Sequence, residues 1–225
     1  MECSSLCNGT TIDSIGFLLN DVTNGLGVFR LTGEDDSPRS NDTRLPWRAT
    51  VAALPYEDVR PLPVCVLLEN VRSLYNVGAF FRTADAVALD KLYLAGITGY
   101  PPQRMITKTA LGAEETVAWQ RTQGAAATIR ELRGADYEIA AIETSVHAVD
   151  LFEWQPRFPV CLLFGHETDG LTPEVAALAD THVRIPMLGR KHSLNVASAG
   201  AVVLYEMLRK YLALRKTPPS LLPLA

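Results

Sequence analysis

The chain alternates short apolar runs with longer segments in which apolar residues recur at helical intervals. The apolar runs predict strands at residues 64–69 (VCVLLE), 92–95, 138–142, 160–164 (VCLLF) and 182–185. The helical intervals predict helices at residues 76–87, 125–132 and about 194–214. Strands that are apolar throughout are buried on both faces, which is typical of parallel sheets covered by helices. The pattern therefore predicts an α/β fold with a mainly parallel sheet flanked by helices.

The two ends of the chain lack this alternation. Residues 1–60 are rich in Asn, Thr, Ser, Gly and Asp, and their run GEDDSPRSNDTR is typical of a solvated linker. Residues 217–225 (TPPSLLPLA) form a proline-broken tail. A chain of 225 residues suffices for one domain with an appendage. We therefore expect a peripheral N-terminal extension over 1–60, one domain over 61–216 and a tail over 217–225.

Composition and charge indicate a globular protein without a membrane-spanning segment or a metal site. With 48% hydrophobic and 20% charged residues the chain is expected to be globular, and it shows neither a signal peptide nor an apolar run of membrane-spanning length. We therefore expect a cytoplasmic protein without a membrane partner. The four cysteines show no metal-ligand spacing, so no metal site is predicted. The net charge is −4, yet residues 72–133 and 184–216 are net positive. These segments form either a phosphate-binding face or ordinary solvated helix faces.

Polar residues in the segment ENVRSLYNVGAFFRTADA, residues 69–86, follow the first predicted strand. Asn76 is a natural helix N-cap, which is a structural explanation for it. Arg82 is expected on the ligand-facing side of the helix, near the carboxyl end of the sheet, where open α/β sheets bind ligands. A surface ion pair explains Arg82 equally well.

A second segment, LLFGHETDGLTPE at residues 162–174, runs from a strand into a turn and then a helix. Gly165 and Gly170 allow the backbone to approach a ligand closely, and Glu167 lies between them. Thr172 with Pro173 is a typical helix start. The turn lacks the Walker ending and the dinucleotide fingerprint, so neither of those phosphate sites is predicted.

The third segment, IPMLGRKHSLNVASAGAVVLYE at residues 185–206, joins a strand to the last helix through a basic, glycine-containing loop. Ser193 is a plausible N-cap, and Asn195 then falls in the first turn without a necessary structural role. The small residues 197–201 (ASAGA) make the start of the helix slim, which lets a backbone or a ligand come close.

In this order the three segments resemble the SpoU/TrmH class of SPOUT RNA methyltransferases. The family's first motif has an Asn followed six residues later by an Arg, as at Asn76 and Arg82, and its second is a Gly-x-Glu-x-x-Gly turn, as at 165–170. Its third reads Ile-Pro-Met, a glycine loop and Ser-Leu-Asn-Val, as at 185–187 and 193–196.

The resemblance covers about residues 62–214. Residues 108–119 (KTALGAEETVAW) also look like a feature of some members, whereas residues 1–60 match none. Ala197 stands where many members carry Ser, a position outside the main functional ones.

The resemblance implies a SPOUT fold with a C-terminal trefoil knot whose loops bind S-adenosylmethionine, mainly through backbone groups. By position, the residues expected to contact this cofactor are Thr144, Gly165, Ile185, Ser193 and Leu194. Family members are usually homodimers in which the first-motif Arg enters the active site of the partner chain.

The implied reaction is methyl transfer to a ribose 2′-hydroxyl of tRNA or rRNA. By analogy Arg82 is the residue at the hydroxyl, Asn76 and Asn195 position the groups around it, Glu167 fixes the arginine or the loop, and Ser193 holds the third-motif loop. Three alternatives remain: a knotted RNA-binding protein without catalysis, a SPOUT enzyme that methylates a base, and a nucleotide-dependent oxidoreductase. The Ser-Leu-Asn sequence favours ribose over base, and the missing dinucleotide fingerprint disfavours the oxidoreductase.

Overall fold

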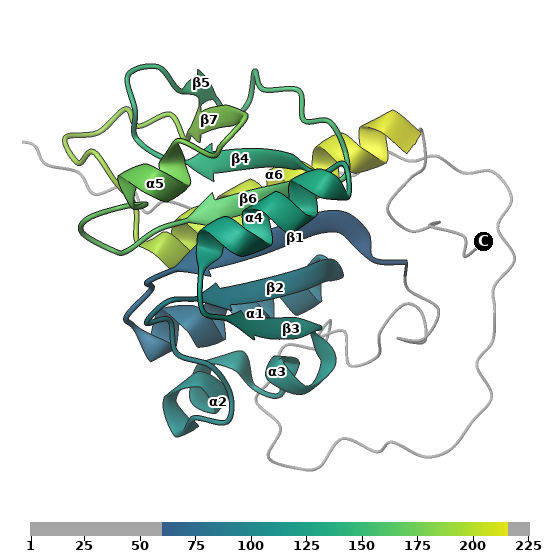
Figure 1. Ribbon diagram of the computed structural model, residues 1–225, viewed down its shortest axis with the longest axis vertical. Helices are drawn as coiled ribbons and strands as arrows, with labels where there is room; N and C mark the ends of the chain where they lie inside the picture. The colour runs from purple at the N-terminus through teal and green to yellow at the C-terminus, as the bar shows by residue number, and fades with distance from the viewer. Residues whose placement is uncertain (1–59, 216–225) are drawn as a thin grey trace, which may run out of the picture. The chain divides into compact units, whose positions relative to one another are not determined.

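A computed structural model describes residues 60–215, and its strands and helices alternate along the chain (Figure 1). The strands are β1 (Leu62–Glu69), β2 (Leu89–Ala95), β3 (Trp119–Thr122), β4 (Glu138–Ile142), β5 (Val149–Asp150), β6 (Val160–Phe164) and β7 (Thr181–Arg184). The helices are α1 (Leu74–Ala86), α2 (Arg104–Ala110), α3 (Ala113–Thr116), α4 (Ala125–Gly134), α5 (Pro173–Ala176) and α6 (Val196–Arg215).

The seven strands form one sheet in the order β3-β2-β1-β6-β4-β7-β5, and every pair in it is parallel. The central strands β1 and β6 are apolar and buried over almost their whole length. Alternate residues of β1 enter two hydrophobic cores, one under α1 and α6 and the other under α4 and α5. Figure 1 shows α4 and α5 on the near face of the sheet and α6 on the far face. The predicted parallel α/β architecture is confirmed, and the trefoil knot stays a prediction.

The slim start of α6 serves close packing against α1. A Cβ added to Gly200 would lie 2.3 Å from Cε1 of Phe80, so only glycine leaves room for this ring. Phe80 in turn contacts Phe164 of β6 edge to face, with 5.2 Å between ring centroids. Such aromatic pairs add about 0.5–1.5 kcal/mol to the gain from burial. The close approach predicted for this helix is therefore made to a side chain of the core.

Two predicted helix starts are wrong. The N-cap of α1 is Ser73, whose side chain accepts a hydrogen bond from the backbone N–H of Asn76, so Asn76 lies in the first turn. At α6 the side-chain oxygen of Asn195 accepts from the N–H groups of Ala197 (3.0 Å) and Ser198 (3.3 Å). This is N-cap geometry, so Asn195 has the capping role predicted for Ser193. The predicted cap at Thr172 is confirmed.

The predicted extension and tail lie outside the described residues, apart from Arg60, so the proposed domain boundaries stay predictions. Within residues 60–215, no helix combines the length and the apolar character needed to cross a membrane.

Candidate functional site

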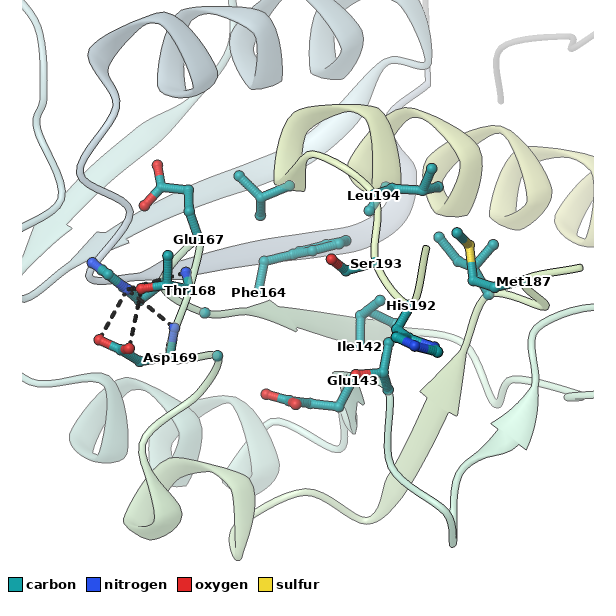
Figure 2. Close-up of a pocket in the computed structure, with 17 residues that line it drawn as sticks. Ile142, Glu143, Phe164, Glu167, Thr168, Asp169, Met187, His192, Ser193 and Leu194 are labelled. Atoms are coloured by element: carbon teal, nitrogen blue, oxygen red, sulfur yellow. Dashed lines mark hydrogen bonds and ion pairs between the residues drawn. The ribbon is translucent and has the colours of Figure 1, made fainter. Parts of the chain in front are cut away.

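A cavity of about 380 Å³ opens where the carboxyl ends of β4, β6 and β7 meet (Figure 2). Its walls come from the loops that follow these three strands and from the first turn of α6. The lining residues are Ile142, Glu143, Thr144, Phe164, Gly165, His166, Glu167, Thr168, Asp169, Gly170, Ile185, Met187, His192, Ser193, Leu194, Val196 and Ala199. All five residues expected to contact a cofactor are among them.

The turn at residues 165–170 is closed by its own backbone. The N–H of His166 donates to the carbonyl of Gly170 at 2.9 Å, and the N–H of Gly170 donates back at 3.0 Å. Gly170 has a φ of 70°, a conformation that favours glycine. At Gly165 a Cβ would lie 2.1 Å from the carbonyl carbon of Gly170. Both glycines of the predicted turn are therefore required by its geometry.

Glu143 holds the end of this turn by a hydrogen bond to the next residue, Leu171. It is a site residue that the sequence did not predict. Its Oε1 accepts the N–H of Leu171 at 2.8 Å, and the side chain also lines the cavity. Its signal in the sequence is its place directly after the strand at 138–142, where a polar residue reaches the carboxyl edge of a parallel sheet.

The loop between β7 and α6 reaches the cavity through Met187 and residues 192–194. Among the described residues, no hydrogen bond uses a backbone N–H or carbonyl of residues 187–194. Backbone polar groups need partners, which a bound ligand or water must supply here. A polar ligand in this cavity can thus be recognised by main-chain groups.

Three predicted site residues form one hydrogen-bonded group beside the cavity. The side-chain amide of Asn76 donates to Oε1 of Glu167 at 3.1 Å, and that of Asn195 donates to Oδ1 of Asn76 at 3.1 Å. The carboxylate of Glu167 also accepts the backbone N–H groups of Arg72 (3.1 Å) and Ser73 (2.9 Å). In Figure 2 this carboxylate points away from Ser193, toward the start of α1. The chain of hydrogen bonds from Glu167 through Asn76 to Asn195 therefore joins all three motifs.

These hydrogen bonds set the charge of Glu167. Burial raises the pKa of this carboxyl, but the N–H groups of Ser73 and Arg72, its own N–H and the Asn76 amide together lower the pKa below its ordinary value. The group is therefore ionised at neutral pH, and its contacts stabilise the folded chain above the pKa that it has when unfolded. This stabilisation is lost as the pH falls through the lowered folded-state pKa.

The Glu167→Gln substitution tests this link. At pH 7 it should lower the free energy of unfolding by about 1 kcal/mol, a modest figure because the carboxylate is exposed and solvent weakens its bonds. The difference between parent and variant should shrink as the pH falls through the lowered folded-state pKa of Glu167, where the parent carboxyl becomes protonated. Denaturant unfolding of both proteins across this pH range measures it, and a difference independent of pH would contradict it.

Arg82 does not reach the cavity of its own chain. Six residues advance a helix by about 600°, so Arg82 lies about 120° around α1 from Asn76. It is exposed and lines two other surface hollows. Within residues 60–215 its side chain makes no hydrogen bond or ion pair, so the structure gives no support to the surface ion pair.

Comparison with solved structures and with characterised proteins yields one family. The chain is 39% identical over 153 residues to the tRNA (guanosine(18)-2′-O)-methyltransferase of Escherichia coli. The aligned region covers 66% of this chain and 63% of that protein. The chain thus matches less than two thirds of the length of this relative.

Two solved structures agree in fold. A TrmH/SpoU tRNA modifying enzyme of A. aeolicus superposes with a TM-score of 0.65 and 27% identity, over 73% of this chain and 84% of that one. An AdoMet-bound rRNA methyltransferase from Sinorhizobium meliloti superposes with a TM-score of 0.61 and 31% identity, over 67% of this chain and 60% of that one.

The sequence profile of the SpoU rRNA Methylase family matches residues 63–205, which include all three motifs and nearly all of the sheet and helices described above. The predicted resemblance is confirmed, and this chain belongs to the SpoU rRNA methylase family.

Proposed function

We propose that this chain transfers a methyl group from S-adenosylmethionine to a ribose 2′-hydroxyl of tRNA or rRNA. The observation that carries the proposal is the hydrogen-bonded group of Asn76, Glu167 and Asn195 at the rim of a cavity lined by all five expected cofactor contacts. The E. coli relative is named as a tRNA ribose methyltransferase and the S. meliloti relative as an AdoMet-bound enzyme, which supports the same reaction.

The cavity suits S-adenosylmethionine in chemistry as well as in size. Apolar side chains such as Ile142, Phe164 and Leu194 offer surface to a flat base. The backbone of Met187 and of residues 192–194, which makes no hydrogen bond to any described residue, offers hydrogen bonds to its polar edge. The second carboxylate oxygen of Glu143 and the hydroxyl of Ser193 are further polar groups of the lining. When bound, the cofactor supplies a methyl group on a positively charged sulfur.

The protein's task is to orient the acceptor hydroxyl. Alignment of two reactants supplies roughly 7–11 kcal/mol, and a positioned proton acceptor supplies about 10²- to 10⁴-fold more. We assign Arg82 to the hydroxyl and its neighbouring phosphate, because a guanidinium stays charged and offers a planar pair of donors. Asn76, which is held by Glu167, and Asn195, which donates to Asn76, are positioning residues, and Ser193 holds the third-motif loop.

This assignment requires a homodimer, since Arg82 lies outside the cavity of its own chain. Val202 and Tyr205 of α6 are 38% and 53% exposed, and Tyr205 lines the same hollow as Arg82, so α6 offers an apolar surface for a second copy. Sedimentation at micromolar concentration should therefore give about twice the chain mass of 24.6 kDa. A monomer would contradict the shared site.

Modified nucleosides in cellular RNA test the function as a whole. RNA from a strain without the gene should lack one 2′-O-methylated nucleoside that the parent strain contains. Loss of a base-methylated nucleoside would favour a base methyltransferase instead, and an unchanged RNA would favour a non-catalytic RNA-binding protein. A protein that modifies RNA in this way acts where that RNA is, which supports the predicted cytoplasmic location.

A further inference from the structure

A second hollow, of about 560 Å³, lies over α1, α2 and α6 and shares no residue with the cavity described above. It is lined by Ala79, Arg82, Thr83, Ala86, Lys108, Thr109 and Tyr205. Two cations and no acidic side chain are in this set. Within residues 60–215, neither Arg82 nor Lys108 forms an ion pair.

The packing of α2 on α1 brings the two cations to one hollow. A Cβ at Gly78 would lie 2.0 Å from Oγ1 of Thr109 and 2.5 Å from the carbonyl oxygen of Ile106, so this glycine permits the close approach. The hydroxyl of Thr109 lies 3.2 Å from the carbonyl oxygen of Tyr75 in α1 and equally far from those of Met105 and Ile106 in its own helix, so the end of α2 packs directly against α1. Lys108, the neighbour of Thr109, is therefore held beside Arg82 by the fold.

Two cations in one hollow repel each other, and an anion bound between them offsets this repulsion by attracting both. The carboxylate nearest in the sequence, Asp85, accepts a hydrogen bond from Thr116 at 2.8 Å and does not line this hollow. On a nucleic acid, such a pair of cations binds the phosphates. Arginine offers a phosphate a planar pair of donors, and lysine offers it a point charge.

We propose that Lys108 is a positioning residue that binds the RNA backbone together with Arg82 and so presents the ribose to the active site. The inference rests on the proposed function, because that function makes RNA the anionic ligand of these two residues. Lys108 contributes binding of the substrate and Arg82 acts at the reacting hydroxyl. The two residues should therefore affect different kinetic constants.

The test compares Lys108→Ala with the parent for binding to bulk tRNA and rRNA from a strain without the gene, at several salt concentrations. Lys108→Ala should weaken RNA binding about tenfold and reduce the slope of log K against log salt by about 1. It should raise KM for RNA and leave kcat within about threefold, and Lys108→Arg should restore most of the affinity.

Arg130 provides the matched control. It is an exposed cation of α4, on the opposite face of the sheet, with no ion pair among the described residues. Arg130→Ala should change neither the RNA affinity nor the salt slope.

Three results would overturn the inference. A Lys108→Ala variant with the parent's affinity and slope would show that Lys108 does not bind RNA. A variant that sediments as a monomer would place Lys108 in contact with the second copy. A parent protein that neither binds nor methylates RNA would overturn the proposed function as well. If instead the parent methylates RNA and Lys108→Ala binds RNA equally well, only the inference about Lys108 fails.

Discussion

Arg82→Ala should lower methyl transfer by a factor of about 10² or more, the scale expected when one positioned catalytic group is lost. Folding and cofactor binding should hardly change. The reason is that the Arg82 side chain is exposed, has no hydrogen bond or ion pair within residues 60–215, and lies outside the cofactor cavity. Turnover of an RNA substrate, calorimetry with S-adenosylmethionine and denaturant unfolding measure the three quantities separately.

Arg82→Lys is the informative companion variant. A lysine keeps the charge but not the planar pair of donors that holds a phosphate and a hydroxyl together, so activity should recover only in part. If Arg82→Ala turned over within threefold of the parent, the arginine would have no catalytic role.

Gly165→Ala should weaken binding of S-adenosylmethionine by about 10- to 100-fold, since forcing a methyl group into a closed turn costs about 1–3 kcal/mol. The added carbon would lie 2.1 Å from the carbonyl carbon of Gly170 and 2.2 Å from the nitrogen of Leu171. These are backbone atoms, so relief of the clash must open the turn that lines the cavity. Calorimetric titration of the cofactor gives the affinity, and circular dichroism shows whether the variant is folded.

Gly189 offers a matched glycine in the neighbouring loop. A Cβ there would meet no atom within 4 Å among the described residues, so Gly189→Ala should bind the cofactor as the parent does. Equal affinities for Gly165→Ala and the parent would mean that the turn is not part of the cofactor site.

The two impaired variants together test the shared active site. Arg82→Ala keeps an intact cavity, and Gly165→Ala keeps an intact arginine. Random reassociation makes half of the dimers mixed, each with one complete site, so the mixture should regain about a quarter of the parent activity. Activity no higher than that of the separate variants would place each arginine in its own chain's site.

The sheet was largely predictable because its central strands are buried on both faces and are therefore apolar throughout. The two strands that were missed, β3 (WQRT) and β5 (two residues), are the edges of the sheet and have no such run. Half-exposed and very short edge strands carry little hydrophobic signal, so periodicity alone does not find them.

The site was predictable as a set of residues, but the contacts among them were not. Helix-capping preferences predicted Asn76 as an N-cap. In the structure its side-chain amide instead donates a hydrogen bond to Glu167, which is 91 residues away in the sequence. Asn195 both caps α6 and donates to Asn76, a double role that its position in the sequence does not reveal. Such contacts depend on which strands become neighbours, and so they follow from the order of the sheet.

The position of an isotopically labelled methyl group tests the central claim most directly. The full chain is incubated with S-adenosylmethionine labelled in its methyl group and with tRNA and rRNA from a strain without the gene, and the RNA is then digested to nucleosides. We expect the label in a single 2′-O-methylnucleoside, whose 3′-phosphodiester resists alkali because the neighbouring hydroxyl is blocked. Label on a base, or no transfer by a folded protein that binds the cofactor, would contradict ribose methylation by this chain.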